Sequence, residues 1–147
     1  MSRNLRTAWE LGMDQSSGSL VSAPASVLYV VDGEAVERES LVSLLGRLGR
    51  EIRECETAEA FLDQMRDGRP FVLIASTHLP GLSGIELLRK LRARGIQAPA
   101  ILISDESDIP TAVDAIRSGA ADFIERPYID RILLRRIEAA LESSESC

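Results

Sequence analysis

The stretch Phe71-Val-Leu-Ile-Ala-Ser-Thr-His-Leu-Pro-Gly-Leu-Ser-Gly84 indicates the fold more directly than any other part of the chain. Its first residues, 71–75, are all apolar and predict a strand buried on both faces of a sheet. Pro80-Gly81 predicts a turn, and Ser83 suits the start of a helix. In α/β sheets, functional side chains gather beyond the carboxyl ends of the strands. Ser76, which follows the apolar run, lies at such a strand end.

Length and composition favour a single soluble domain. The chain has 147 residues, of which 45% are hydrophobic and 27% are charged. Its net charge of −6 argues against non-specific binding to nucleic acid or anionic membranes. No apolar run approaches the roughly 20 residues of a membrane helix, and we find no secretory signal. Cys55, Cys147 and His78 form neither a disulfide framework nor a zinc motif. We expect a cytoplasmic protein.

The chain divides into three parts by composition. Residues 1–25 are rich in serine, glycine and other small residues without a sustained period, which predicts a disordered extension. The alternative is a short partner-binding segment centred on Thr7-Ala-Trp-Glu-Leu-Gly-Met13. Residues 26–142 show regular patterns and form the predicted domain, and residues 143–147 form a polar tail.

Strand and helix patterns alternate through this domain. We expect strands at 27–31, 50–56, 71–75, 100–103 and 121–125, and helices from the apolar stripes at 41–48, 58–65, 84–91, 112–119 and 129–137. This alternation implies right-handed crossovers and a parallel sheet covered on both faces. The second and fifth strands are charged or short, which suits sheet edges. The predicted fold is a flavodoxin-like doubly wound α/β domain with a five-stranded parallel sheet of order 2-1-3-4-5 and five helices.

Polar residues follow four of the predicted strands and would converge on one crevice. Acids, hydroxyls and a cation together suit a phosphate or magnesium-phosphate ligand, although no glycine-rich phosphate loop is present. A Ser76–His78–Asp32 triad can be written down, but nothing in the sequence would orient it. The residues at the strand ends are Asp32-Gly33-Glu34, Ser76-Thr77-His78, Ser104-Asp105-Glu106 and Arg126-Pro127.

Four motifs across residues 26–142 resemble the receiver domain of two-component response regulators, in the CheY-like superfamily and its FixJ-type subgroup. They are Tyr29-Val-Val-Asp-Gly-Glu34, Leu79-Pro-Gly-Leu-Ser-Gly84, Ala112-Val-Asp-Ala-Ile-Arg-Ser-Gly-Ala120 and Asp122-Phe-Ile-Glu-Arg-Pro127. The resemblance implies an aspartate at the end of the third strand that accepts phosphate from a kinase histidine. It also implies two acids that hold Mg²⁺, a hydroxyl and a lysine that bind the phosphoryl group, and a switch aromatic.

The chain departs from this pattern at three positions. Ser76 stands where the resemblance places the phosphoacceptor aspartate. Gly33 stands where the second magnesium-binding acid is expected, which leaves Asp32 as a weak remnant with help from Glu34. Arg126 replaces the lysine before the proline, so a planar fork takes the place of a compact ammonium.

These changes predict the loss of phosphorylation by the usual route. A serine hydroxyl cannot form an acyl phosphate, and it needs an adjacent base to act as a nucleophile. Mg²⁺ prefers carboxylate oxygens in octahedral geometry, so we expect weak or absent Mg²⁺ binding and no other cofactor. Ser104 and Phe123 do match the hydroxyl and switch-aromatic positions. We expect no catalytic residue, and we interpret Ser76 as a small polar residue bonded to nearby backbone.

The sequence therefore favours a stand-alone pseudo-receiver that signals through phosphorylation-independent protein–protein interaction. Its partner would be a histidine kinase, another regulator or a second copy, bound through the fourth helix, fifth strand and fifth helix. Mixed charges on this face suit a symmetric dimer. We also expect an Asp32–Arg126 salt bridge that fixes one conformation, and a solvated polar face at Glu37-Arg38-Glu39.

Two alternatives stay open. The first is a receiver that is still phosphorylated or metal-dependent within a phosphorelay, through Ser76 or a neighbouring acid such as Asp105. The second is a crevice reused for a small anion or a nucleotide. About twenty residues follow Arg126, too few for a DNA-binding effector domain, but a longer regulator containing this chain remains compatible with the sequence.

Overall fold

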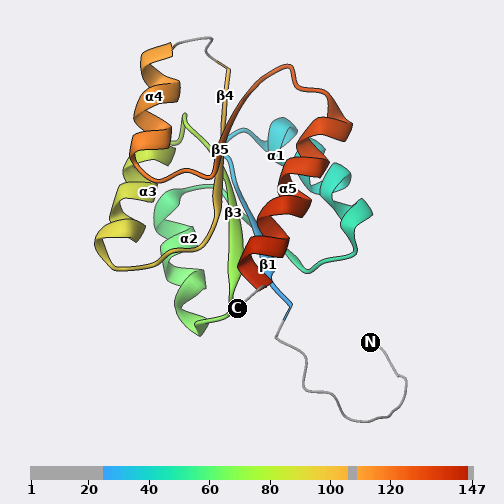
Figure 1. Ribbon diagram of the computed structural model, residues 1–147, viewed down its shortest axis with the longest axis horizontal. Helices are drawn as coiled ribbons and strands as arrows, with labels where there is room; N and C mark the ends of the chain where they lie inside the picture. The colour runs from blue at the N-terminus through green and yellow to red at the C-terminus, as the bar shows by residue number, and fades with distance from the viewer. Residues whose placement is uncertain (1–24, 106–108, 146–147) are drawn as a thin grey trace.

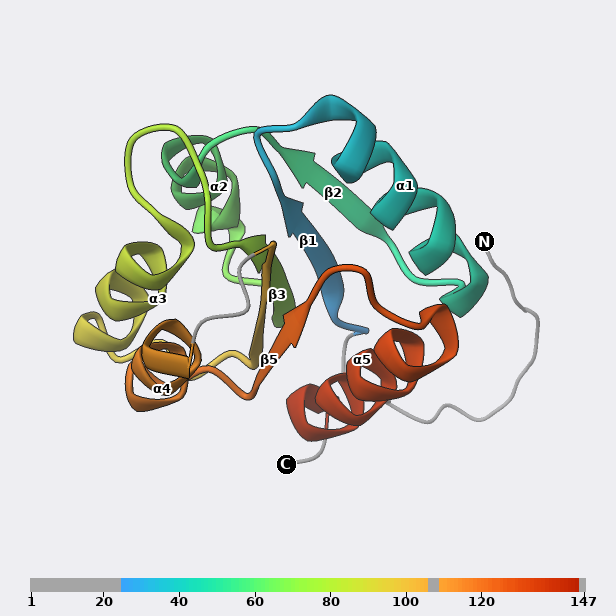
Figure 2. The same cartoon turned by 90° about the horizontal axis from the view of Figure 1, so that it is seen from above.

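The computed structural model describes residues 25–105 and 109–145, which form a parallel sheet with helices on both faces (Figures 1 and 2). The strand order is β2-β1-β3-β4-β5, and every neighbouring pair is parallel. The predicted doubly wound α/β fold is therefore confirmed. The strands are β1 (Val27–Val31), β2 (Ile52–Cys55), β3 (Phe71–Ser76), β4 (Ala100–Ser104) and β5 (Asp122–Glu125).

Within the described residues, four α-helices and two short 3₁₀ turns connect the strands, and a fifth α-helix follows β5. Figure 2 shows α1 and α5 on one face of the sheet and α2, α3 and α4 on the other. The α-helices are α1 (Ala35–Leu45), α2 (Ala58–Gln64), α3 (Gly84–Ala93), α4 (Ile109–Arg117) and α5 (Asp130–Glu145), and the 3₁₀ turns are η1 (Gly46–Leu48) and η2 (Met65–Asp67).

The three central strands are buried along their whole length, as their continuous apolar runs predict. Alternate side chains enter one of two cores. Under α2 to α4, the rings of Tyr29, Phe61 and Phe71 pack edge to face with centroids 4.9 to 5.6 Å apart. Such pairs add about 0.5–1.5 kcal/mol each beyond the area they bury. Under α1 and α5, aliphatic side chains such as Leu45 and Leu133 fill the second core.

The segment after β3 is held close to the sheet by its capping chemistry. The Ser83 hydroxyl accepts a hydrogen bond from the Glu86 backbone N–H (3.1 Å), and the Glu86 carboxylate accepts one from the Ser83 N–H (2.9 Å), which forms a capping box. A Cβ on Gly84 would lie 2.3 Å from the Ser76 carbonyl oxygen. Only glycine lets α3 begin so close to the end of β3, so this turn fixes the loop that borders the crevice.

The structure differs most from the predicted element ends at α5 and at β2. Helix α5 continues to Glu145, so Ser143 and Ser144 are helical although their composition suggested a polar tail. The reason is tertiary: the Glu145 carboxylate accepts hydrogen bonds from Arg50 (3.0 Å from Nη2) and from the Ser26 N–H (2.9 Å). β2 is correspondingly shorter than residues 50–56, because Arg50 lies outside the ladder and binds α5.

Apart from Ala25, the predicted N-terminal extension lies outside the described residues. None of the helices within residues 25–105 and 109–145 combines the length and apolar character that a membrane crossing requires.

Candidate functional site

The carboxyl ends of β1, β3, β4 and β5 surround an open crevice of about 850 Å³. The parallel strands bring these ends to one edge of the sheet, and the following loops form the walls. The structure thus brings together most of the predicted site residues. Those in the lining are Asp32, Gly33, Glu34, Ser76, Asp105 and Arg126.

The Arg126 guanidinium lies at the centre of this crevice and contacts three carboxylates. Its Nη2 donates to Asp32 Oδ2 at 2.9 Å, and its Nη1 lies 3.4 Å from Asp105 Oδ1. Its buried Nε lies 2.7 Å from Glu37 Oε2 as an ion pair that lacks hydrogen-bond geometry. The predicted Asp32–Arg126 salt bridge is confirmed, and the same cation joins the segments that follow β1, β4 and β5.

The Asp32 carboxylate is fully engaged and almost completely buried, with 2% of its side chain exposed. Its Oδ1 accepts a hydrogen bond from the Glu34 backbone N–H at 2.9 Å, and its Oδ2 takes the Arg126 contact. Arg38 donates to the Asp32 carbonyl oxygen at 2.7 Å, which anchors the start of α1 over β1. Because both carboxylate oxygens have these partners, the arrangement differs from a Ser76–His78–Asp32 triad.

Burial and the three carboxylates act in opposite directions on the charge of Arg126. Burial lowers the pKa of its guanidinium, because only 11% of the side chain is exposed and the charged form loses hydration. The contacts with Asp32, Glu37 and Asp105 outweigh that effect and leave the pKa of Arg126 raised. The guanidinium is therefore a permanent cation inside an acidic crevice.

The position of the Glu37 side chain shows that one interpretation made from the sequence was wrong. Its position on α1 suggested a solvated polar face, but the side chain reaches the crevice and pairs with Arg126. Arg38 is likewise turned inward, toward Glu54 (3.4 Å) and Glu56 (3.7 Å). The docking of α1 over the end of β1 decides these orientations, and a helical period alone does not.

Ser76 is buried at the end of β3, where its Oγ accepts a hydrogen bond from the His78 backbone N–H at 3.1 Å. This bond agrees with the interpretation of Ser76 as a small polar residue bonded to nearby backbone. His78 itself is exposed on the loop. The next residue after Ser76, Thr77, donates its N–H to Ile103 O at 2.9 Å, so the loop continues the ladder toward β4.

Gly33 is exposed but lies directly beside the loop that follows β3. A Cβ at this position would lie 2.8 Å from Pro80 Cδ. Any larger residue would therefore require the Pro80 ring to move. The close approach of the two loops is part of how the crevice is built.

Ser104 and Phe123 lie outside the crevice lining. Ser104 is 1% exposed, and its carbonyl oxygen accepts from the Arg126 N–H at 2.8 Å. Phe123 is half-buried and packs against the core under α2 to α4. The peptide bond between Arg126 and Pro127 is cis. The hydrogen bond to Ser104 fixes the backbone of Arg126, from which the guanidinium enters the crevice.

The crevice does not suit a divalent cation in this arrangement. In the part of the chain that the structure describes, no three His, Cys, Asp or Glu side chains are grouped to hold a metal ion. Gly33 offers no side-chain oxygen ligand, and Asp32 Oδ2 accepts a hydrogen bond from the Arg126 guanidinium at 2.9 Å. A magnesium ion at this place would compete with Arg126 for the Asp32 carboxylate, and the two cations would repel each other.

The strand order and the polar edge of the sheet have the architecture of CheY-like receiver domains. The crystal structure of FixJ-N superimposes with a TM-score of 0.76 at 38% identity, covering 83% of this chain and 98% of that one. The receiver domain of NtrX from Brucella abortus gives a TM-score of 0.74 at 35% identity, covering 80% and 99%.

Sequence comparison identifies the family. Residues 28–138 match the response regulator receiver domain. The transcriptional regulatory protein FixJ of Rhizobium meliloti (strain 1021) is 40% identical over 115 residues, or 78% of this chain and 56% of FixJ. Response regulator protein TodT of Pseudomonas putida is 37% identical over 122 residues, or 83% of this chain and 54% of TodT. The chain belongs to the receiver-domain family of two-component response regulators, and it spans little more than half the length of these relatives.

Removal of the central cation gives a direct test of the site. Arg126→Ala leaves the buried Asp32 carboxylate without its partner, and breaking a buried pair in this way costs about 3–5 kcal/mol. We expect a loss of that order in the free energy of unfolding, measured by urea denaturation. The matched control is Arg136→Ala, which removes an exposed pair with Asp122 (2.5 Å) and costs about 0–1 kcal/mol. Equal losses in the two variants would contradict the central role of Arg126.

Proposed function

We propose that this chain is a pseudo-receiver, which keeps the receiver scaffold and signals through protein–protein interaction without phosphorylation. The observation that carries the proposal is the Arg126 guanidinium, which contacts Asp32, Glu37 and Asp105 inside the crevice. A guanidinium at the family's lysine position thus engages carboxylates that the family's chemistry would use to hold a metal ion beside an incoming phosphoryl group.

The residues around this cation support the same proposal. Ser76 stands at the end of β3, where the receiver pattern has an aspartate, and its hydroxyl oxygen accepts a backbone hydrogen bond. A neutral hydroxyl in this place cannot accept phosphate as an acyl phosphate. Gly33 supplies no second acid, and a side chain at this position would collide with Pro80. Each change removes a different requirement of phosphotransfer.

A permanent ion pair would hold the receiver in one state. In a two-state domain, a ligand shifts the population only through its different affinity for the two states. Here the guanidinium and its partners belong to the same chain, so the contact forms without a ligand. We infer that the loops after β1, β4 and β5 stay in the arrangement set by Arg126, and that signalling depends on when and where the partner is present.

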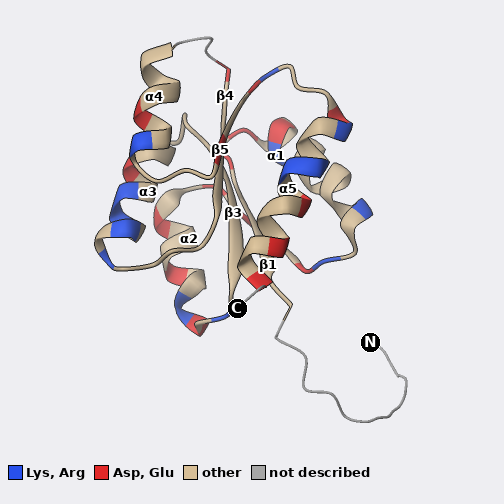
Figure 3. Ribbon diagram, viewed as in Figure 1, with Lys and Arg blue, Asp and Glu red and all other residues tan. Residues whose placement is uncertain are grey.

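The face formed by α4, β5 and α5 is the surface we assign to the partner. Helix α4 exposes Ile109, Val113 and Ile116 along one stripe, and Ile132 is exposed on α5. Acidic and basic segments occur together on both helices (Figure 3). An exposed apolar stripe between mixed charges suits a protein interface. The partner would be a histidine kinase, another regulator or a second copy of this chain.

The two alternatives are less well supported by the geometry. Phosphorylation through Ser76 would need a base beside its hydroxyl, and Asp105 lies in an ion pair with Arg126 (3.4 Å). A small anion or a nucleotide would meet a crevice in which the central cation is already neutralised by carboxylates, so little positive potential remains to attract it.

Incubation with Mg²⁺ and acetyl phosphate tests the loss of phosphotransfer. We expect no phosphate-sized mass increment on the intact protein, because the strand end offers a hydroxyl and the metal position is taken by Arg126. The matched control is Ser26→Ala, which removes a buried hydroxyl just before β1, away from the crevice. A stoichiometric increment on the natural chain that disappears in Ser76→Ala and persists in Ser26→Ala would overturn the proposal.

A pair of valine substitutions tests the assigned face. Val113 on α4 and Val36 on α1 are both exposed. We expect Val113→Asp to weaken association at least tenfold, because a charge in an apolar interface is desolvated without a partner, and Val36→Asp to leave it unchanged. Sedimentation velocity measures self-association, and the same variants are then scored for capture of a purified kinase. Equal behaviour of the two variants in both assays would refute the assignment.

A further inference from the structure

A second pocket, of about 670 Å³, opens at the amino edge of the sheet, opposite the crevice. It lies between the segment from η2 to β3, the loop from α3 to β4, and the end of α5. Most of its wall is apolar, and its size is within the range of sites that bind small organic groups. The apolar lining residues are Met65, Pro70, Phe71, Ile96, Ala98 and Pro99.

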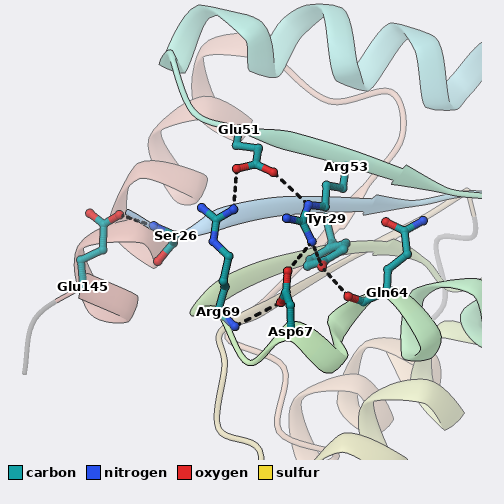
Figure 4. A network of polar contacts seen from close by, with 8 residues as sticks. All are labelled: Ser26, Tyr29, Glu51, Arg53, Gln64, Asp67, Arg69 and Glu145. Carbon is teal, nitrogen blue, oxygen red and sulfur yellow. Dashed lines mark hydrogen bonds and ion pairs between the residues drawn. The ribbon is translucent and has the colours of Figure 1, made fainter. Parts of the chain in front are cut away.

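One wall of this pocket is fixed by a network of polar contacts (Figure 4). Arg53 on β2 donates to the Tyr29 hydroxyl (2.9 Å) and to Asp67 (2.7 Å), and the Tyr29 hydroxyl donates to the Gln64 carbonyl (3.3 Å). Arg69, which lies between η2 and β3, donates a hydrogen bond to the Glu51 carboxylate at 2.6 Å. These bonds tie η2 and the start of β3 to β1 and β2, so the wall is a preformed surface.

The first described residues of the chain lie beside this pocket. The Ser26 N–H donates to Glu145 (2.9 Å), and the Ser26 and Ser144 hydroxyls are hydrogen-bonded at 2.7 Å. Ser143 and Ser144 both line the pocket. Residues 1–24, which lie outside the described part of the chain, are therefore attached at its rim.

The segment Thr7–Met13 has the chemistry that the pocket would bind. It contains Trp9, the single tryptophan of the chain, together with Leu11 and Met13. Glu10 within it and Asp14 directly after it are acidic, whereas Arg66 and Arg69 stand at the pocket rim. The apolar wall thus matches the indole, and the rim arginines have the opposite charge to Glu10 and Asp14, although Arg69 is also paired with Glu51 and Arg66 with Asp63 (3.7 Å).

We propose that the segment Thr7–Met13 binds in this pocket of its own chain, with the Trp9 indole against the apolar wall. Ten residues, 15–24, link Asp14 to the domain, and they include Ser16-Ser-Gly-Ser19. A flexible linker of this length spans about 17 Å on average and gives an effective concentration in the millimolar range. Even an intrinsic dissociation constant of about 0.1 mM would keep about 90% of the molecules docked.

Trp9 fluorescence tests this proposal, because no other tryptophan contributes. We expect the full chain to show blue-shifted emission and several-fold weaker acrylamide quenching than the same chain unfolded in urea. Ser143→Phe places a ring on an exposed position that lines the pocket, and we expect it to displace Trp9 and return emission and quenching toward the unfolded values. Ala139→Phe, at an exposed position of the same helix outside the lining, is the matched control and should change neither.

Three results would overturn the proposal. If acrylamide quenches Trp9 as strongly in the native chain as in urea, the segment is undocked. Equal protection in Ser143→Phe and Ala139→Phe would mean that it binds elsewhere. Protection that falls on dilution would mean that it binds a second copy. Gln97→Phe, at an exposed position of the α3–β4 loop in the lining, repeats the test if Ser143→Phe lowers the melting temperature.

Discussion

The contact of one guanidinium with three carboxylates is the interaction on which the carboxyl edge of this domain depends. Asp32 and Glu37 come from the segment that follows β1 and Asp105 from the one that follows β4, and their charges repel one another unless a cation lies among them. Arg126 supplies that cation from a third segment, at 2.9 Å from Asp32, 2.7 Å from Glu37 and 3.4 Å from Asp105. Because the cation is covalently part of the chain, the site needs no ion from solution. We infer that this replacement converts a ligand-dependent site into a fixed one.

The close contacts around the crevice are consistent with a fixed site. Gly33 leaves room for the Pro80 ring, and Gly84 lets α3 begin against the Ser76 carbonyl, so the loop after β3 lies close to both neighbouring segments. A larger residue at either glycine would force these segments apart. Packing as well as charge thus holds the loops at the polar edge, while the apolar stripe on α4 is exposed. This division supports the proposal of interaction without phosphotransfer.

Sequence patterns predicted the sheet order because continuous apolar runs mark the buried strands, and charged or short runs mark the edges. The Asp32–Arg126 pair was also predictable, since parallel strands bring their carboxyl ends to one edge. Glu37 was misjudged because a helical period shows only that a position is polar, and the docking of α1 decides what it faces. The last turn of α5 was missed because its serine-rich sequence is stabilised by Arg50 and Ser26, 95 and 119 residues away in the chain.

A Mg²⁺ titration followed by NMR tests most directly whether Arg126 has replaced the metal ion. The backbone amide signals of Gly33, Thr77 and Asp105 report on the crevice, because these residues line it. With NaCl used to match ionic strength, the account predicts that millimolar Mg²⁺ leaves their chemical shifts unchanged. Saturable shifts confined to these amides would show that Mg²⁺ enters the crevice despite Arg126, and would contradict the account.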